Sequence, residues 1–249
     1  EIRRNNEKLR WASPTRLRSM WTLQGLGKLK GLKDIKKGIG LDLRPTLLTR
    51  YRSIEGSESD FDLEPSFDAF YRLTPSLTAT MTWQTDFAET DVDERQINTT
   101  RFPLFFPEKR AFFLEDAEKF GFGGISRSPL PFHSRTIGLD SNGNRVPIRL
   151  GSKITGKEGK WNIGLLGVGL EETTELDSDE VYVGRVSYDI FDESSVGGIF
   201  TLGDPRSNEE AETVGVDFEL KDSSFINDNI GIFRGWAMRT DTENGSDTG

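Results

Sequence analysis

Two glutamates, Glu108 and Glu115, lie in a segment rich in phenylalanine and charge. Most glycoside hydrolases use two catalytic carboxyl groups. One protonates the leaving oxygen, and the other acts as nucleophile or base. Both glutamates have basic neighbours, Lys109 and Arg110, and this favours ion pairs that fix the segment over a catalytic pair. We therefore predict no catalytic residues, and we keep a glycan-acting hydrolase that uses carboxylates of the 86–116 region as an alternative.

An acidic stretch precedes this segment. Its members are Asp86, Glu89, Asp91, Asp93 and Glu94. Clustered carboxylates can bind a hard cation such as calcium, but the spacing differs from that of an EF-hand loop and no glycine lies at its centre. The spacing favours a solvated acidic loop, so we expect no metal site and no cofactor.

Nucleophilic catalysis has little support in the sequence. The chain has no cysteine and one histidine, His133, which any Ser-His-Asp triad would have to use. It also has no GxSxG motif, the turn that carries the nucleophile in α/β-hydrolases. The lack of cysteine also removes disulfides and thiolate metal sites.

The block Arg95–Gly124, RQINTTRFPLFFPEKRAFFLEDAEKFGFGG, contains most of these charges. Pro103 and Pro107 interrupt any regular strand or helix there. A long connection dense in aromatic and charged residues is usually folded and specific, so we predict an insert over 88–135 that plugs a barrel or packs against its wall. Its loop anchors or ligand contacts are expected to be Asp86, Glu89, Asp91, Arg101, Glu108, Lys109, Arg110 and Glu115.

Segments that alternate between apolar and polar residues lie on both sides of the block and predict antiparallel strands. They cover residues 20–30, 39–51, 61–73, 77–87, 146–156, 161–170, 181–191, 194–202, 214–220 and 230–238. The phase changes at Leu165 and Leu166, which suggests a β-bulge. The last residues, DTENGSDTG, have the composition of a loop without a strand.

The length of these runs favours a membrane barrel. Many are about ten residues or longer, whereas globular strands have a mode of about five to six residues and bilayer-crossing strands need about nine to eleven. We expect an apolar outer belt and an interior lined by Asp62, Glu64, Asp68 and Arg72. A soluble β-sandwich that binds carbohydrate stays open as an alternative, and its signature would be shorter strands in two packed sheets.

Composition narrows the class further. The 249 residues carry a net charge of −9, which argues against nucleic acid as a partner because phosphate binding needs a basic surface. No run approaches the roughly 18 apolar residues of a spanning helix. We predict that residues 1–17 are a linker or the tail of an upstream domain and that residues 18–249 are part of a larger β-barrel domain.

The chain resembles a family of uncharacterised bacterial proteins, DUF5916. The resemblance rests on TDFAETDVDERQINTTRFPLFFPEKRAFFLED, FHSRTIG, VPIRLGSKITGKEGKWNIGLL and SSVGGIFT, with FFPEKRAFFLE the most specific motif. It implies an outer-membrane β-barrel that follows a family-9-type carbohydrate-binding module, and it supplies no catalytic residues.

Together these observations predict an all-β, antiparallel up-and-down transmembrane barrel with a Phe-rich inserted loop. We expect a non-catalytic protein of the bacterial outer membrane that takes part in the binding or passage of glycans. Its expected partners are membrane lipid and a carbohydrate ligand, with no nucleic acid.

Overall fold

The computed structural model describes residues 39–52, 60–85, 108–126, 129–140, 146–173, 180–191, 193–207, 210–226, 229–242 and 245–248. The linker predicted over 1–17 and the strand predicted over 20–30 lie outside these residues. Residues 39–249 form one compact unit. The account below concerns that unit alone.

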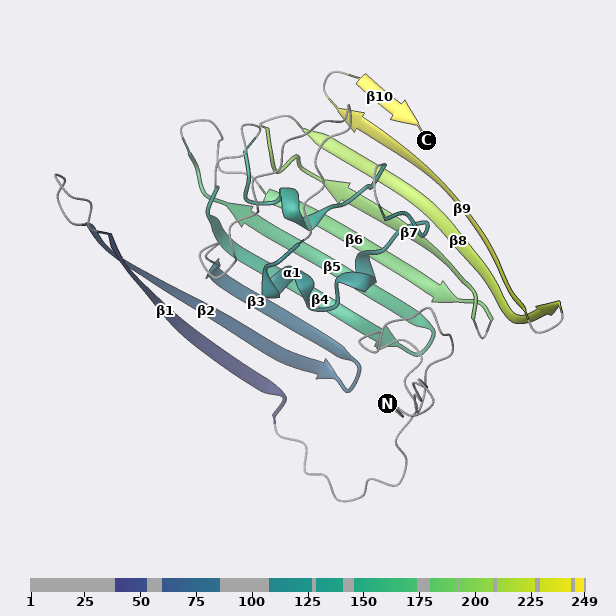
Figure 1. Ribbon diagram of the computed structural model, residues 1–249, viewed down its shortest axis with the longest axis horizontal. Coiled ribbons are helices and arrows are strands. Elements are labelled where there is room, and N and C mark those ends of the chain that lie inside the picture. The colour runs from purple at the N-terminus through teal and green to yellow at the C-terminus, as the bar shows by residue number, and fades with distance from the viewer. Residues whose placement is uncertain are drawn as a thin grey trace, which may run out of the picture. The chain divides into compact units, whose positions relative to one another are not determined.

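The described part of the chain forms a single antiparallel sheet of ten strands in sequence order (Figure 1). The strands are β1 (Leu41–Arg52), β2 (Asp60–Thr74), β3 (Leu77–Thr85), β4 (Ile148–Glu158), β5 (Trp161–Leu170), β6 (Glu180–Asp189), β7 (Ser195–Leu202), β8 (Ala211–Ile226), β9 (Asn229–Thr242) and β10 (Gly245–Thr248). The predicted all-β, up-and-down arrangement is confirmed. The described sheet is open, with β1 and β10 as its edges, so closure into a barrel is not observed.

The pairing register separates the side chains into two faces. One face, which we call the outer face, is apolar and exposed along nearly the whole sheet. Its large apolar residues are Leu41, Leu43, Leu47, Tyr51, Phe61, Leu63, Tyr71, Met81, Trp83, Leu150, Trp161, Leu165, Tyr182, Val186, Val196, Phe200, Leu202, Val214, Val216, Leu220 and Phe233. We call the opposite face, on which residues 108–126 and 129–140 pack, the inner face.

The inner face carries the buried core. Its members come from the insert and from the strands beneath it, and they are Phe112, Phe113, Phe120, Phe122, Ile137, Val146, Ile148, Leu166, Val168, Leu170, Val181, Val183 and Ile199. The insert contributes a short helix α1 (Ala111–Leu114) and two 3-10 turns, η3 (Ala117–Phe120) and η4 (Ser134–Thr136), which lie over the sheet (Figure 1). No helix among the described residues is long and apolar enough to cross a membrane.

Two expectations about strands are wrong. The register of β5 is continuous through Leu165 and Leu166, and the β4–β5 pairing shifts only between Ile148 and Leu150. Leu166 is 5% exposed beneath the insert, whereas Leu165 is 39% exposed on the outer face. Both faces of β5 are apolar at this point, and this accounts for two successive leucines without a bulge. At the end of the chain, Gly245–Thr248 pairs with β9 as β10, where a loop was predicted.

Candidate functional site

A buried ion pair between Glu108 and Arg110 stabilises the fold of the insert. The Arg110 side chain is 2% exposed, and its Nη2 lies 2.7 Å from Oε2 of Glu108. Arg110 also donates to the main-chain oxygens of Ile137 at 2.7 Å and Ser134 at 2.6 Å. Its guanidinium lies 4.1 Å from the ring centroid of Phe113. Arg110 thereby joins residues 108–113 to 134–137, and the predicted role of Glu108 and Arg110 as ion-pairing anchors of the loop is observed.

The same contacts set the charge of Glu108. Burial alone raises the pKa of its carboxyl, but hydrogen bonds and the positive charge of Arg110 outweigh burial, so the pKa lies below its usual value of 4.5. A general acid in a glycosidase needs a raised pKa. The environment of Glu108 is therefore that of a structural carboxylate.

The second anchor of the insert is a residue of the sheet, Lys153 of β4, which is 2% exposed. Its ammonium donates to the main-chain oxygens of Phe112 at 2.6 Å and Glu115 at 2.5 Å, at the end of α1, where a cation stabilises the free carbonyls. Next to it, the Thr155 hydroxyl donates to Oδ2 of Asp116 at 2.7 Å. Glu115 was predicted to anchor the loop through its carboxylate, but its side chain is exposed and its main-chain carbonyl makes the contact with Lys153.

A third anchor, which the sequence did not reveal, joins β6 to β8. Arg185 and Asp217 form an ion pair at 2.8 Å with side chains 8% and 10% exposed. Arg185 Nε donates to the Gly121 oxygen at 2.9 Å, and the Gly123 N–H donates to Asp217 Oδ2 at 2.8 Å. The sequence signal for this pair is one charged residue at an inner-face position in each of two otherwise apolar strands, β6 and β8.

The phenylalanine rings of the insert lie over glycines of the sheet. A Cβ added to Gly215 of β8 would lie 2.7 Å from the ring of Phe122. One added to Gly151 of β4 would lie 3.0 Å from the ring of Phe112. These strand positions have no side chain because a ring occupies the space. This packing shows that the described part of the insert packs against the sheet wall, one of the two predicted arrangements.

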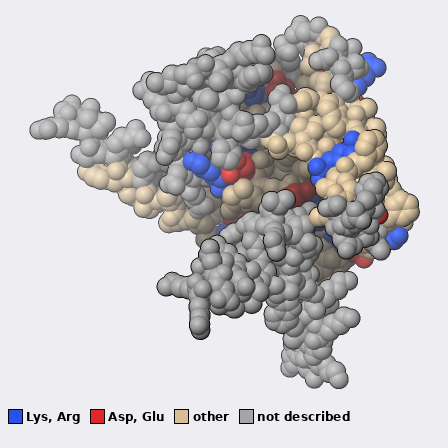
Figure 2. All heavy atoms as spheres, turned by 45° about the vertical axis from the view of Figure 1, so that its right-hand side comes forward, with Lys and Arg blue, Asp and Glu red and all other residues tan. Residues whose placement is uncertain are grey.

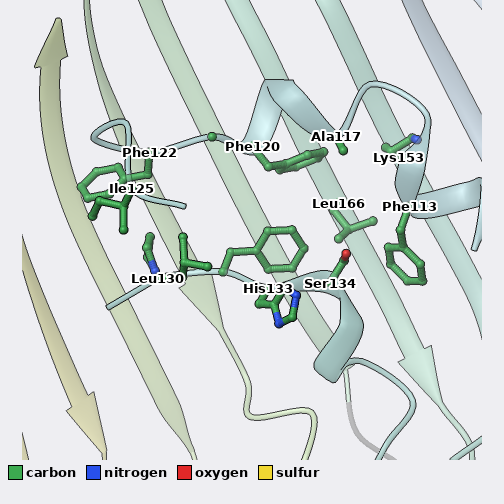
Figure 3. Close-up of a pocket in the computed structure, with 13 residues that line it drawn as sticks. Phe113, Ala117, Phe120, Phe122, Ile125, Leu130, His133, Ser134, Lys153 and Leu166 are labelled. Atoms are coloured by element: carbon green, nitrogen blue, oxygen red, sulfur yellow. The ribbon is translucent and has the colours of Figure 1, made fainter. Parts of the chain in front are cut away.

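Two arms of the insert, residues 113–125 and 130–134, enclose a pocket of about 160 Å³ together with strands β4 and β5 (Figure 3). Its lining is largely apolar and is formed by Phe113, Ala117, Phe120, Gly121, Phe122, Ile125, Leu130, Pro131, Phe132, His133, Ser134, Lys153 and Leu166. His133, for which no catalytic role is predicted, forms part of the wall of this pocket. Ser134, next to His133 in the chain, also lines the pocket.

The inner face of β1 and β2 is polar, in contrast to that of β4–β6. Glu64, Asp68 and Arg72 share this face, as predicted for an interior lining, and the side chain of Asp62 lies outside the described residues. Arg44 pairs with Asp42 at 2.7 Å and lies 4.2 Å from the ring centroid of Phe70. Among the residues that Figure 2 colours, acidic and basic side chains are interspersed.

Asp86, Glu89, Asp91 and Arg101 lie outside the described residues. Lys109 is half-buried, and its main-chain N–H donates to Glu108 Oε1 at 3.0 Å. Within the ranges that the structure covers, no group of three or more His, Asp or Glu side chains could hold a metal ion.

Residues 38–161 match the model of a family described as a domain of unknown function (DUF5916). This match supports the assignment of the chain to an uncharacterised family. The comparison with curated proteins found no match, and neither did the comparison with solved structures.

Proposed function

We propose that this chain forms wall strands of a bacterial outer-membrane β-barrel and that the insert packs inside that wall. One observation carries the proposal: the outer face presents exposed apolar side chains on nine successive strands, from β1 to β9. Soluble monomers rarely expose an apolar patch of more than a few hundred Å². Lipid is the environment in which such a face is stable.

The dimensions of the strands support the same proposal. From β1 to β9 they span 8 to 16 residues, which brackets the roughly nine to eleven that cross a bilayer. The described residues form one sheet with polar and covered side chains on one face, whereas a soluble sandwich would bury its apolar face against a second sheet. We therefore favour the barrel over the sandwich.

The barrel is proposed to be non-catalytic and to act in the binding or passage of glycans. The polar inner face of β1 and β2 supports this part, because Asp42, Arg44 and Asp68 offer hydrogen-bonding groups of both charges beside Phe70. Neutral polyhydroxyl ligands need such groups, and neither sign of charge dominates. The charge of Glu108, held by Arg110, gives no support to the alternative of a hydrolase.

Fractionation of Gram-negative cells that express the full-length protein tests the proposal. We expect the protein in the outer membrane, with a folded form that migrates differently from the heated form on a gel. A monodisperse protein in buffer without detergent, with no heat-modifiable band, would refute the barrel. Uptake of oligosaccharides by liposomes that contain the purified protein tests the glycan part separately.

A further inference from the structure

The pocket beneath the insert has the size of a single small ring. Its volume is about 160 Å³. An engineered apolar cavity of ~150 Å³ in another protein takes up benzene, so a molecule of this size fits. Because most of the lining is apolar, the hydroxyl groups of a sugar would lose their hydrogen bonds there. The glycans of the proposed function are therefore unsuited to this pocket.

Aromatic side chains determine which apolar molecule suits it. The rings of Phe120 and Phe132 lie 5.6 Å apart between centroids and are tilted by 57°. Both line the pocket, together with Phe113 and Phe122. Figure 3 shows Phe120 coming from one arm of the insert and His133 and Ser134 from the other. A further ring can pack there edge-to-face or offset, the arrangements that aromatic pairs prefer.

Three polar side chains line the pocket, those of Lys153, Ser134 and His133, and the first two favour a neutral ligand with a hydroxyl group. The ammonium of Lys153 donates to two carbonyl oxygens of the insert, so its charge does not require an anionic ligand. The Ser134 hydroxyl lines the pocket. Its oxygen has two lone pairs that can accept a hydrogen bond from the hydroxyl group of a ligand.

We propose that this pocket binds a neutral, single-ring aromatic molecule that carries a hydroxyl group, of the phenol class. The ring packs against Phe120 and Phe132, and the hydroxyl donates to Oγ of Ser134. The site is formed by the insert and the sheet beneath it. It depends neither on lipid nor on glycan, so its test is independent of the proposed function.

Titration of the full-length protein with phenol, followed by calorimetry or by ligand-observed NMR, tests the proposal. Leu166→Phe fills the pocket, and Leu165→Phe adds the same group on the opposite face of the same strand. We expect saturable binding to the wild type and to Leu165→Phe in the same solution, and binding at least about tenfold weaker to Leu166→Phe. Ala117→Leu, at an exposed position of the insert that lines the pocket, should also weaken binding. It does so without a change in the buried core.

The role of Ser134 is tested by a comparison of phenol with toluene, which has the same ring and no hydroxyl. Ser134→Ala should weaken phenol binding about five- to tenfold and leave toluene binding unchanged, because only phenol loses a hydrogen bond. Absence of saturable phenol binding to the wild type would overturn the proposal. Equal affinity in the wild type and in both filled variants would overturn it as well, because the binding would then lie elsewhere.

Discussion

Arg185 of β6 and Asp217 of β8 meet beneath the insert at 2.8 Å, with β7 between their strands. Each also binds the main chain of the segment 121–123. The pair therefore links β6 and β8, which flank β7, to the insert, and it adds a charged contact to those that Lys153 and Thr155 make with the insert.

Removal of one member of this pair is expected to be costly. Asp217→Ala leaves a buried guanidinium without its partner, which typically destabilises a protein by about 3–5 kcal/mol. The double variant Arg185→Met/Asp217→Leu should cost less than Asp217→Ala, because no buried charge is left. Denaturant unfolding of the two variants measures the difference. An Asp217→Ala protein as stable as the wild type would show that the pair does not hold the insert.

The contact between Phe122 and Gly215 predicts a steric effect. Gly215→Ala places a methyl group 2.7 Å from the Phe122 ring and should cost about 1–3 kcal/mol of unfolding free energy. Gly198→Ala, in the adjacent strand β7, is the matched control, because a Cβ there meets only one atom, at 3.4 Å. The control should be neutral or slightly stabilising. Phe122→Leu in the Gly215→Ala background should recover part of the loss, and no recovery would mean that the strain lies elsewhere.

The Glu108–Arg110 ion pair predicts a pH dependence of stability. The pKa of Glu108 is lowered in the folded protein, so the unfolded chain binds a proton at higher pH than the folded chain does. The stabilisation is complete above the usual pKa of 4.5 and is lost as pH falls through the lower, folded value. Glu108→Gln should have a flatter stability profile below about pH 5, measured by chemical unfolding between pH 7 and pH 3. Identical profiles for both proteins would contradict the assignment.

Lipid contact at the outer face predicts different effects of arginine at two exposed leucines. Leu165 lies in the middle of β5 on the outer face, and Leu114 lies on the insert with 49% of its side chain exposed. Leu165→Arg should cost about 2–4 kcal/mol near the bilayer midplane and reduce the folded fraction in the membrane. Leu114→Arg should change stability by less than about 0.5 kcal/mol. Equal folded fractions of the two variants in heat-modifiability gels would argue against a lipid-facing β5.

The strands were predictable where the two faces of the sheet differ in polarity. Along β2, apolar Phe61, Leu63 and Tyr71 alternate with Glu64 and Arg72, and the pattern gives both the strand and the orientation of its faces. Along β5, the face that packs against the insert is apolar too, so alternation disappears and the adjacent leucines give the false prediction of a bulge. The strand β10 has no apolar pattern, and only its pairing with β9 identifies it.

The candidate site was predictable only where its partners are close in sequence. Glu108 and Arg110 are two residues apart, and their ion pair follows from the local pattern. Arg185 and Asp217 are 32 residues apart, so their contact depends on the register of two strand pairs. The glycines beneath the rings carry no signal of their own, because glycine is also common in turns and bulges.

The position of the insert has a consequence for how the chain folds. Strands β4 to β9 follow one another through shorter connections, so their pairing can form early from contacts close in sequence. Strands β3 and β4 pair directly although residues 86–147 separate them, and closing that loop costs more entropy than closing a hairpin. We expect the β3–β4 seam to be the slowest pairing of the sheet. The rings of the insert bury against β4, β5 and β8, all on one side of this seam, so the insert packs on strands that can pair before the seam closes.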